Sequence, residues 1–369
     1  MDRFRGFAAA WRLHGSHTLG FNSVATMSRD IVQERSAVNV LIVGGSGLLG
    51  TFAVREALAR GHTVTALARG QPDSTEPVRW LRGDLHHMSE EELRAAVSGQ
   101  DAVVYAMGLD DRETHPRPSY PVFYEDHVTV CLSVLRASRE AGARKFVVLG
   151  SYFTHFDERL PELNLSAHHP YIRSRRDQRQ AVIEEARPGF DTYVLELPYI
   201  IGSLPGRVPP WSFLFSMLAG RGKLAFFFGR GGTAAVTALQ VAQAAMGALE
   251  PGVPSQAYAL GGVNWSWPEW AERFFTVSHE RKALAAIPRA LFAFFGLLSS
   301  LLLRLRGRER GLSISRFAEL QYRDAFVDPA PAQLALGYPH DDYDRALAEQ
   351  IREWMALRRP RSSAALTPA

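Results

Sequence analysis

The sequence lacks the residues that several common kinds of functional site require. It contains a single cysteine, Cys131, which excludes disulfides within the chain, cysteine-rich zinc sites and iron–sulfur clusters. Its twelve histidines form no H-E-x-x-H motif or similar ligand spacing, so we expect no metal ion. The formal net charge is only +4, and no basic stripe argues for a nucleic acid partner.

Long hydrophobic runs are also absent from the start of the chain. Residues 1–26 contain one acidic residue, three arginines and no long apolar run, which argues against a secretory signal peptide. We expect residues 1–36 to be a disordered extension outside the fold, and the protein to be cytoplasmic. A transit peptide and a true start at Met27 are the alternatives for this segment.

The strongest signal that is present is an apolar strand leading into a glycine-rich turn. Residues 38–50 read VNVLIVGGSGLLG, and a helix is predicted over 48–60. The glycines fit the spacing G-x-G-x-x-G as well as G-x-x-G-x-x-G, and they let the backbone approach a pyrophosphate closely. The N-terminus of the helix attracts the same anion through its free N–H groups and its dipole. We therefore expect a dinucleotide to bind at Gly44, Gly45, Ser46, Gly47, Leu48, Leu49 and Gly50.

The end of the next predicted strand, His62–Ala68, indicates which dinucleotide the protein binds. An NAD-binding protein places an acidic residue there, about 20 residues after the glycines, to bind the ribose 2′-hydroxyl. This sequence has no acidic residue between Glu56 and Asp73, and Arg69 stands at the strand end instead. An arginine suits a 2′-phosphate, so we expect NADP(H) to be favoured over NAD(H). An ordinary solvated charge is the alternative for Arg69.

Predicted strands and helices alternate through the first half of the chain. The strands are predicted at 38–43, 62–68, 78–81, 101–107, 145–149 and 191–197. This alternation predicts an α/β fold with a Rossmann-type doubly wound parallel sheet. Ligands of such sheets bind beyond the carboxyl ends of the strands, where the glycine turn, Arg69, Asp84, Gly108 and Ser151 all fall.

The second half is expected to build a second region. We place the dinucleotide-binding domain at residues 37–203 and expect residues 233–262 to return to it. The segments 204–232 and 263–357 are expected to form a smaller, mostly helical C-terminal substrate lobe, and 358–369 a disordered tail. Aromatic residues are frequent in the lobe. The alternatives are that they line an apolar pocket for a lipophilic substrate or that they form the core of the lobe itself.

The motifs that follow successive strands resemble those of the short-chain dehydrogenase/reductase superfamily, most closely its extended and atypical, epimerase/dehydratase-like branches. The resemblance covers roughly residues 38–262 and rests on the glycine turn, Gly83-Asp84-Leu85, Ala106-Met107-Gly108, Gly150-Ser151, Tyr171-Ile-Arg-Ser-Arg175 and Leu197-Pro198-Tyr199-Ile-Ile-Gly202. It implies that Asp84 and Leu85 line the adenine. It also implies that Ala106, Met107 and Gly108 support the cofactor and that Pro198 covers the nicotinamide.

The same resemblance implies a catalytic Tyr-x-x-x-Lys pair, and this sequence has Tyr171 followed by Arg175. Residues four apart share a helix face, so the cation can lower the pKa of the tyrosine towards the range that general acid/base catalysis needs. Arg175 supplies the charge and can donate to ribose hydroxyls, but it does not release a proton as lysine does. A catalytic tyrosine and a structural tyrosine at a helix start are the two interpretations of Tyr171. The hydroxyl partner is Ser151 or Thr154, and His127 aligns with an asparagine of the family.

Two functions are consistent with these residues. The favoured one is an NAD(P)-dependent oxidoreductase or epimerase/dehydratase-like enzyme that acts on a carbonyl/alcohol group of a small, apolar substrate. The alternative is a non-catalytic NADP(H)-binding module that senses redox state. The departures at His127 and Arg175, together with the undecided hydroxyl, motivate this alternative.

One further segment, residues 290–310, joins an apolar run to a basic one. Residues 290–303 carry no charge, and four arginines follow between 304 and 310. A bilayer-spanning helix needs about 20 apolar residues, so this segment does not span a membrane. The alternatives are a buried or dimer-forming helix, which would give a homodimer, and an interfacial helix in weak peripheral contact with anionic lipid. The apolar stripe of this helix is Leu291, Phe294, Phe295, Leu298, Leu302 and Leu305.

Overall fold

The computed structural model describes residues 37–70, 75–220 and 222–358. The predicted N-terminal extension, residues 1–36, and the predicted tail beyond residue 358 therefore lie outside the described residues.

The main sheet has seven strands in the order β11-β7-β6-β4-β1-β2-β3. Every neighbouring pair in it is parallel. The predicted Rossmann-type parallel sheet is confirmed, because each apolar run of the first half forms one strand. The strands are β1 (Asn39–Val43), β2 (Thr63–Ala68), β3 (Val78–Arg82), β4 (Ala102–Tyr105), β6 (Lys145–Leu149), β7 (Asp191–Glu196) and β11 (Ala257–Ala259).

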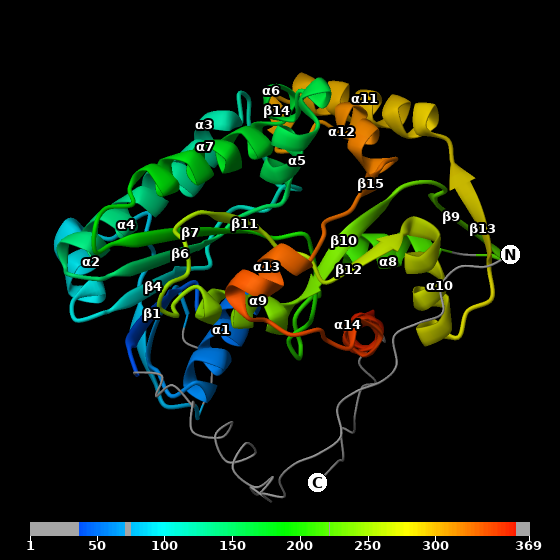
Figure 1. The fold of residues 1–369 in the computed structure, drawn as a ribbon. Helices are drawn as coiled ribbons and strands as arrows, with labels where there is room; N and C mark the ends of the chain where they lie inside the picture. Colours follow the sequence, from blue (N-terminus) through cyan, green and yellow to red (C-terminus); the bar gives the residue numbers. More distant parts are fainter. Residues whose placement is uncertain (1–36, 71–74, 221, 359–369) are drawn as a thin grey trace, which may run out of the picture. The chain divides into compact units, whose positions relative to one another are not determined.

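Helices cover both faces of this sheet because alternate residues of its strands point to opposite sides. Val40 and Ile42 of β1 pack with apolar residues of α1 (Leu48–Ala59) and α9 (Ala238–Gly247). The other face of the sheet packs with α2 (Glu90–Val97), α4 (Val130–Glu140) and α7 (Pro170–Glu184). Figure 1 shows these two helical layers above and below the sheet.

The position of the site follows from the strand order. The chain runs outward from β1 to β2 and β3, then crosses back to place β4 on the other side of β1. Connections that leave neighbouring strands in opposite directions open a crevice at the carboxyl ends of those strands. Here the crevice lies between the loops that follow β1 and β4.

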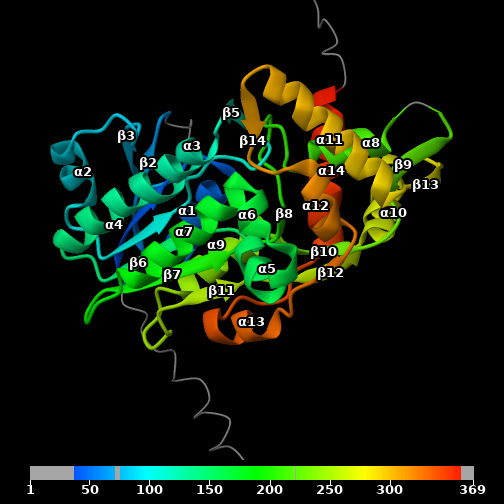
Figure 2. The ribbon, with the colours of Figure 1, turned by 90° about the horizontal axis from the view of Figure 1, so that it is seen from above.

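The C-terminal lobe contains sheet as well as helices. Strand β10 (Gly232–Thr237) pairs with β12 (Val263–Ser266), β8 (Tyr199–Ile201) and β15 (Asp324–Ala325). A separate pair joins β9 (Leu224–Phe228) to β13 (Ala283–Ile287). Figure 2 shows the helices that surround these strands. They are α8 (Ser212–Leu218), α10 (Trp267–Ser278), α11 (Arg289–Leu305), α12 (Ile314–Gln321) and α14 (Tyr343–Arg358).

Most aromatic side chains of the lobe form its core. Trp267, Trp270 and Phe274 of α10 are almost completely buried and pack with Phe215 and Phe227. This favours the interpretation that these aromatic residues form the core of the lobe over the interpretation that they line a pocket.

Shorter elements connect the two regions. Strand β5 (Thr114–Pro116) pairs antiparallel with β14 (Arg308–Arg310), which brings distant parts of the chain together. The remaining elements are α3 (Tyr120–Tyr124), a π-helical turn (Glu125–Thr129), α5 (Phe153–Arg159), a 3₁₀ turn (Pro161–Leu163), α6 (Leu165–His168) and α13 (Ala330–Leu336).

Candidate functional site

A cavity of about 540 Å³ lies at the carboxyl ends of the central strands. Its wall combines the start of α1, the loops after β4, β6 and β7, one side of α7 and part of the 203–212 segment. Nine of the residues predicted from the sequence line it: Leu48, Leu49, Ala106, Met107, Gly108, Ser151, Tyr171, Arg175 and Pro198.

Of the predicted cofactor residues that do not line this cavity, five belong to the glycine turn and three lie further away, towards β2 and β3. Asp84 lines a separate cavity of about 360 Å³ between β3 and α2. Leu85 is half-buried against the core on that side of the sheet. Arg69 is exposed immediately after β2. A dinucleotide is long enough to extend from the main cavity over the carboxyl ends of β1 and β2. Residues at this edge of the sheet would therefore lie near its adenosine end.

The glycine turn has the geometry that a pyrophosphate site requires. Gly44 has a positive φ of 78°, and a Cβ there would lie 2.7 Å from the carbonyl oxygen of Ala106. A Cβ on Gly50 would lie 2.1 Å from the carbonyl oxygen of Gly44, so α1 packs directly on the turn. The first turn of α1 contains no acidic residue, and its N-cap, Gly47, has no side chain that could bond the free N–H groups. Its N–H groups are therefore available to an anion, and the residues present fit a dinucleotide.

Gly47 allows this site to be tested without disturbing the fold. A Cβ at Gly47 would meet only the carbonyl oxygen of Gly44, at 3.3 Å. We expect Gly47→Ala to weaken NADPH binding at least about tenfold, because the methyl group occupies the path of the pyrophosphate. The melting temperature should change by less than about 2 °C. Titration calorimetry and thermal unfolding measure the two effects, with Gly220→Ala in the lobe as the control. Unchanged affinity in the Gly47 variant would contradict binding at this turn.

Tyr171 and Arg175 lie side by side on α7 and face the cavity. The helix begins at Pro170, so Tyr171 occupies its first turn and Arg175 follows one turn later. Arg175 Nε donates to the Tyr171 hydroxyl at 3.3 Å. Both side chains are largely buried, with 8% and 7% of their surfaces exposed. The two residues that the sequence spacing placed on one face are thus in direct contact.

The pKa of Tyr171 reflects opposing influences. Burial is the largest of them and raises the pKa of the phenol above its ordinary value. The positive charge and hydrogen bond of Arg175 act in the other direction, as does a hydrogen bond with the Ser151 hydroxyl. The negative charge of Asp111 raises the pKa. The phenol is therefore protonated at neutral pH in the protein alone and can act as an acid.

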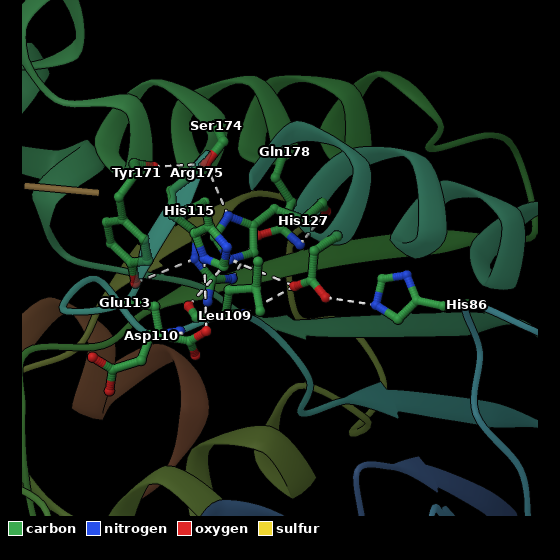
Figure 3. Close-up of polar contacts among 11 residues, drawn as sticks. His86, Leu109, Asp110, Glu113, His115, His127, Tyr171, Ser174, Arg175 and Gln178 are labelled. Carbon is green, nitrogen blue, oxygen red and sulfur yellow. Dashed lines mark hydrogen bonds and ion pairs between the residues drawn. The ribbon is translucent and has the colours of Figure 1, made fainter. Parts of the chain in front are cut away.

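A buried network holds this pair in place (Figure 3). Arg175 Nη1 donates to Gln178 at 2.9 Å, and Gln178 Nε2 donates to the carbonyl of His127 at 2.6 Å. The His127 ring lies 2.8 Å from the Ser174 hydroxyl, which donates to the Tyr171 carbonyl. Burial and then the charge of Arg175 hold the pKa of His127 well below its usual value, so the imidazole is neutral. His127 lies in the π-helical turn, a distortion that is frequent at functional sites.

The two candidate hydroxyls occupy different surroundings. Ser151 lines the cavity beside Tyr171. Thr154 is fully buried one helical turn further, and its hydroxyl bonds the Ser151 carbonyl and the Glu196 carboxyl group. Geometry therefore favours Ser151 over Thr154 as the hydroxyl that a substrate in the cavity would meet.

Sequence patterns did not indicate several polar and aromatic residues of the cavity wall, among them Asp111, Arg112, Arg207 and Trp211. Arg207 donates to the carbonyl of Ser46 at 2.5 Å and so places a cation beside the glycine turn. Trp211 adopts the left-handed backbone conformation, with φ 65°, and its ring stacks on Tyr199 with the centroids 3.9 Å apart. The contact of Arg207 with Ser46 joins segments 161 positions apart in the chain, so no local pattern signals it.

Asp111 is a second titratable group beside Tyr171. Its side chain is 21% exposed. Burial, followed by the repulsion of Asp110, raises the pKa of Asp111 to about 7, whereas hydrogen bonds and the charge of Arg112 lower the pKa of Asp110. The cavity therefore holds a carboxyl group that changes charge near neutrality.

This shift predicts a pH-dependent effect of Asp111→Asn on stability. Between an unfolded pKa near 3.8 and a folded pKa near 7, the unfolded chain loses a proton that the folded chain keeps, so the wild type loses stability as pH rises through this window. Asparagine retains a hydrogen-bond donor and carries no charge. We expect the variant to melt about 2–6 °C higher than wild type at pH 8, with no difference at pH 4. Differential scanning calorimetry at pH 4 and pH 8 measures both differences. A higher melting temperature of the variant at pH 4 only would contradict the raised pKa of Asp111.

Parts of the chain are similar to a known protein family and to known enzymes. Residues 44–196 match the model of a family described as NAD(P)H-binding, and this segment includes the glycine turn, Ser151, Tyr171 and Arg175. A 4-hydroxy-2-methyl-3-oxo-4-farnesyl-3,4-dihydroquinoline-1-oxide ketoreductase of Stigmatella aurantiaca is 28% identical over 179 residues, which are 45% of this chain and 51% of that protein. The decarboxylating sterol-4-alpha-carboxylate 3-dehydrogenase of Homo sapiens is 29% identical over 129 residues, 34% of this chain and 32% of that protein. The chain thus spans about half the length or less of these two relatives.

Solved structures share the fold over nearly the whole described chain. The structure of UDP-glucose 4-epimerase from Bifidobacterium longum in complex with NAD⁺ and UDP superposes with a TM-score of 0.61 at 15% identity. The match covers 87% of this chain and 98% of that one. The two proteins therefore share a fold.

Proposed function

We propose that this chain belongs to the extended branch of the short-chain dehydrogenase/reductase superfamily. We further propose that it is an NADP(H)-dependent oxidoreductase that acts on a carbonyl/alcohol group of a lipophilic substrate. The observation that carries the proposal is the contact of Tyr171 with Arg175 and Ser151 on the cavity wall, next to an open glycine turn. Relatives that are named as enzymes give no support to the redox-sensor alternative.

The cofactor would be held from the glycine turn to α7. The N–H groups at the start of α1 would bind the pyrophosphate, with Arg207 as a second source of positive charge. Ala106, Met107, Gly108 and Pro198 would surround the nicotinamide end. A Cβ on Gly108 would lie 2.4 Å from the Arg175 guanidinium, so the absence of a side chain there leaves room for Arg175 to reach the ribose.

When bound, the nicotinamide would supply or accept a hydride. In the reductive direction the Tyr171 hydroxyl gives its proton to the carbonyl oxygen of the substrate, while Ser151 donates a hydrogen bond to the same oxygen. Arg175 stabilises the phenolate that remains on Tyr171. In the oxidative direction the phenolate takes the alcohol proton, and the same two side chains hold the oxygen in position.

Two observations support a lipophilic substrate. Apolar and aromatic groups form much of the cavity wall, including Phe153, Tyr199, Leu204, Val208 and Trp211. The two relatives described above are named for a farnesyl-bearing quinoline oxide and for a sterol carboxylate, both of them large lipophilic molecules. Asp111 and Arg112 add a polar end, so the substrate would carry a hydrogen-bonding group beside its reactive carbon.

The preference for NADP(H) rests on Arg69. No acidic residue takes the position of a 2′-hydroxyl ligand after β2, and the exposed Arg69 can reach a 2′-phosphate at this edge of the sheet.

A substrate panel tests the proposed activity. Absorbance at 340 nm follows NADPH oxidation with sterol, terpenoid and aromatic ketones, and NADP⁺ reduction with the matching alcohols. We expect turnover with lipophilic members of the panel and none with UDP-sugars. Turnover of UDP-sugars alone would contradict the substrate class, and the absence of turnover together with the absence of cofactor binding would contradict the proposed function.

A further inference from the structure

Helix α11 presents a broad apolar surface to solvent. Of its 17 residues only Gly296 is buried. Eight large apolar side chains on the outer side are between 44% and 77% exposed. Their spacing of three and four residues places them on one face of the helix. We call this surface the α11 apolar face: Leu291, Phe294, Phe295, Leu297, Leu298, Leu301, Leu302 and Leu305.

Packing on the other side fixes the orientation of this face. A Cβ on Gly296 would lie 2.6 Å from the backbone nitrogen of Ser315 and 2.8 Å from the Ile314 side chain, so α11 rests closely on the start of α12. Figure 2 shows the two helices together at the surface of the lobe. Because the inner side of α11 is occupied by α12, the apolar face cannot turn into the lobe without separating the two helices.

Charge around the apolar face is of one sign. Arg289 precedes it, Arg304 lies beside its last residue, Leu305, and Arg306 and Arg308 follow it; all four arginines are exposed. No acidic residue occurs between Arg281 and Arg308. The next acidic residue, Glu309, accepts hydrogen bonds from the backbone and hydroxyl of Ser119.

This charge distribution distinguishes between two occupants. A second copy of the chain paired antiparallel along α11 would bring Arg304, Arg306 and Arg308 against Arg289 of its partner, a repulsive arrangement. An anionic bilayer surface attracts every one of these cations while its acyl region accepts the apolar side chains. Within the described residues no helix has both the length and the apolar character to cross a bilayer, so α11 would lie along the interface.

The apolar face is also connected to the cavity. Immediately after α11, β14 pairs with β5, which follows the Asp110–Arg112 segment of the cavity wall. Gly311 then accepts a hydrogen bond from the backbone of Tyr171 at 3.1 Å. The chain therefore runs from the apolar face directly to the wall beside Tyr171.

We propose that α11 docks this protein onto anionic membranes by inserting its apolar face into the interface. The further consequence, that docking presents the cavity to substrates dissolved in the bilayer, rests on the proposed function. Docking itself does not, because it depends only on the exposed side chains of α11 and on the arginines that flank them.

Vesicle co-sedimentation tests docking, with vesicles of phosphatidylcholine containing 30 mol% phosphatidylglycerol or none. We expect wild type to bind the anionic vesicles in 50 mM salt and to bind them weakly in 500 mM salt. Phe294→Ser with Leu298→Ser should lower the partition coefficient at least about tenfold. Arg304→Gln with Arg306→Gln should lower it about 10- to 30-fold. The matched controls, Leu334→Ser on α13, where 90% of the side chain is exposed, and Arg352→Gln, should bind as wild type does.

Two results would overturn the proposal. The first is no binding of wild type to anionic vesicles at 50 mM salt. The second is a wild-type dimer, seen by sedimentation velocity, that the Phe294/Leu298 variant converts to monomer, because a second copy would then cover the face. NADPH titration in the absence of vesicles tests the proposed function separately. A failure of membrane docking can therefore be distinguished from a failure of the proposed function.

Discussion

Replacement of Tyr171 by phenylalanine is expected to lower kcat by about 10²–10⁴-fold while NADPH binding stays as in wild type. The substitution removes one oxygen atom, which is the group that would exchange a proton with the substrate. The ring keeps its edge-on contacts with Phe123 and His127, so the first turn of α7 should stay in place. Steady-state kinetics on the best substrate of the panel, together with NADPH titration, provide the measurement.

A control for this experiment is Tyr124→Phe, which removes a hydroxyl from an exposed tyrosine that is not part of the cavity wall. We expect that variant to keep kcat within about threefold of wild type, because its hydroxyl has no role in the proposed proton transfer. Equal activity in the Tyr171 variant and wild type would remove Tyr171 from the mechanism.

Removal of the charge at position 175 is the second large effect. The charge of Arg175 and its hydrogen bond lower the pKa of Tyr171, so Arg175→Met should raise that pKa further. At pH 7 the phenolate then becomes rarer, and alcohol oxidation should slow at least about tenfold. Arg175→Lys retains the charge and should recover most of the rate.

The pH profile distinguishes this effect from general damage to the site. With Arg175→Met the midpoint of the oxidative pH profile should move to higher pH, while with Asp111→Asn it should move to lower pH, because the negative charge of Asp111 raises the pKa of Tyr171. A lower rate in the Met variant with an unchanged midpoint would mean that Arg175 only supports the structure.

Much of the fold could be predicted because it depends on local patterns. Parallel strands buried on both faces require the continuous apolar runs that mark β1, β2, β4, β6 and β7. The glycine turn could be predicted for a related reason, since Gly44 and Gly50 occupy positions where a Cβ would collide with the backbone. In both cases the constraint and its signal lie in the same stretch of chain.

The site was only partly predictable, because its walls come from distant segments. Sequence patterns placed Tyr171 and Arg175 together, since they are one helical turn apart. Patterns did not indicate Arg207, whose guanidinium reaches Ser46 across 161 positions of the chain, or Trp211, whose ring stacks on Tyr199. The choice between Ser151 and Thr154 also needed three dimensions, because it depends on Glu196, which occupies the Thr154 hydroxyl.

The exposed side of α11 shows a different limit. Helical periodicity identified an apolar stripe, but the same periodicity is expected whether the stripe meets the protein core, a second copy or a lipid surface. Only the position of α12 on the opposite side of the helix, fixed by the contact at Gly296, excludes burial of this stripe within the lobe.

Titration of the wild-type protein with NADPH and with NADH is the most direct test of the account, because every proposed catalytic step requires a dinucleotide beside Tyr171. We expect saturable binding of both molecules at one site per chain, with NADPH bound more tightly through Arg69. Tighter binding of NADH than of NADPH would contradict only the proposed role of Arg69. Absence of binding by either cofactor, in a protein whose circular dichroism shows it to be folded, would contradict the account as a whole.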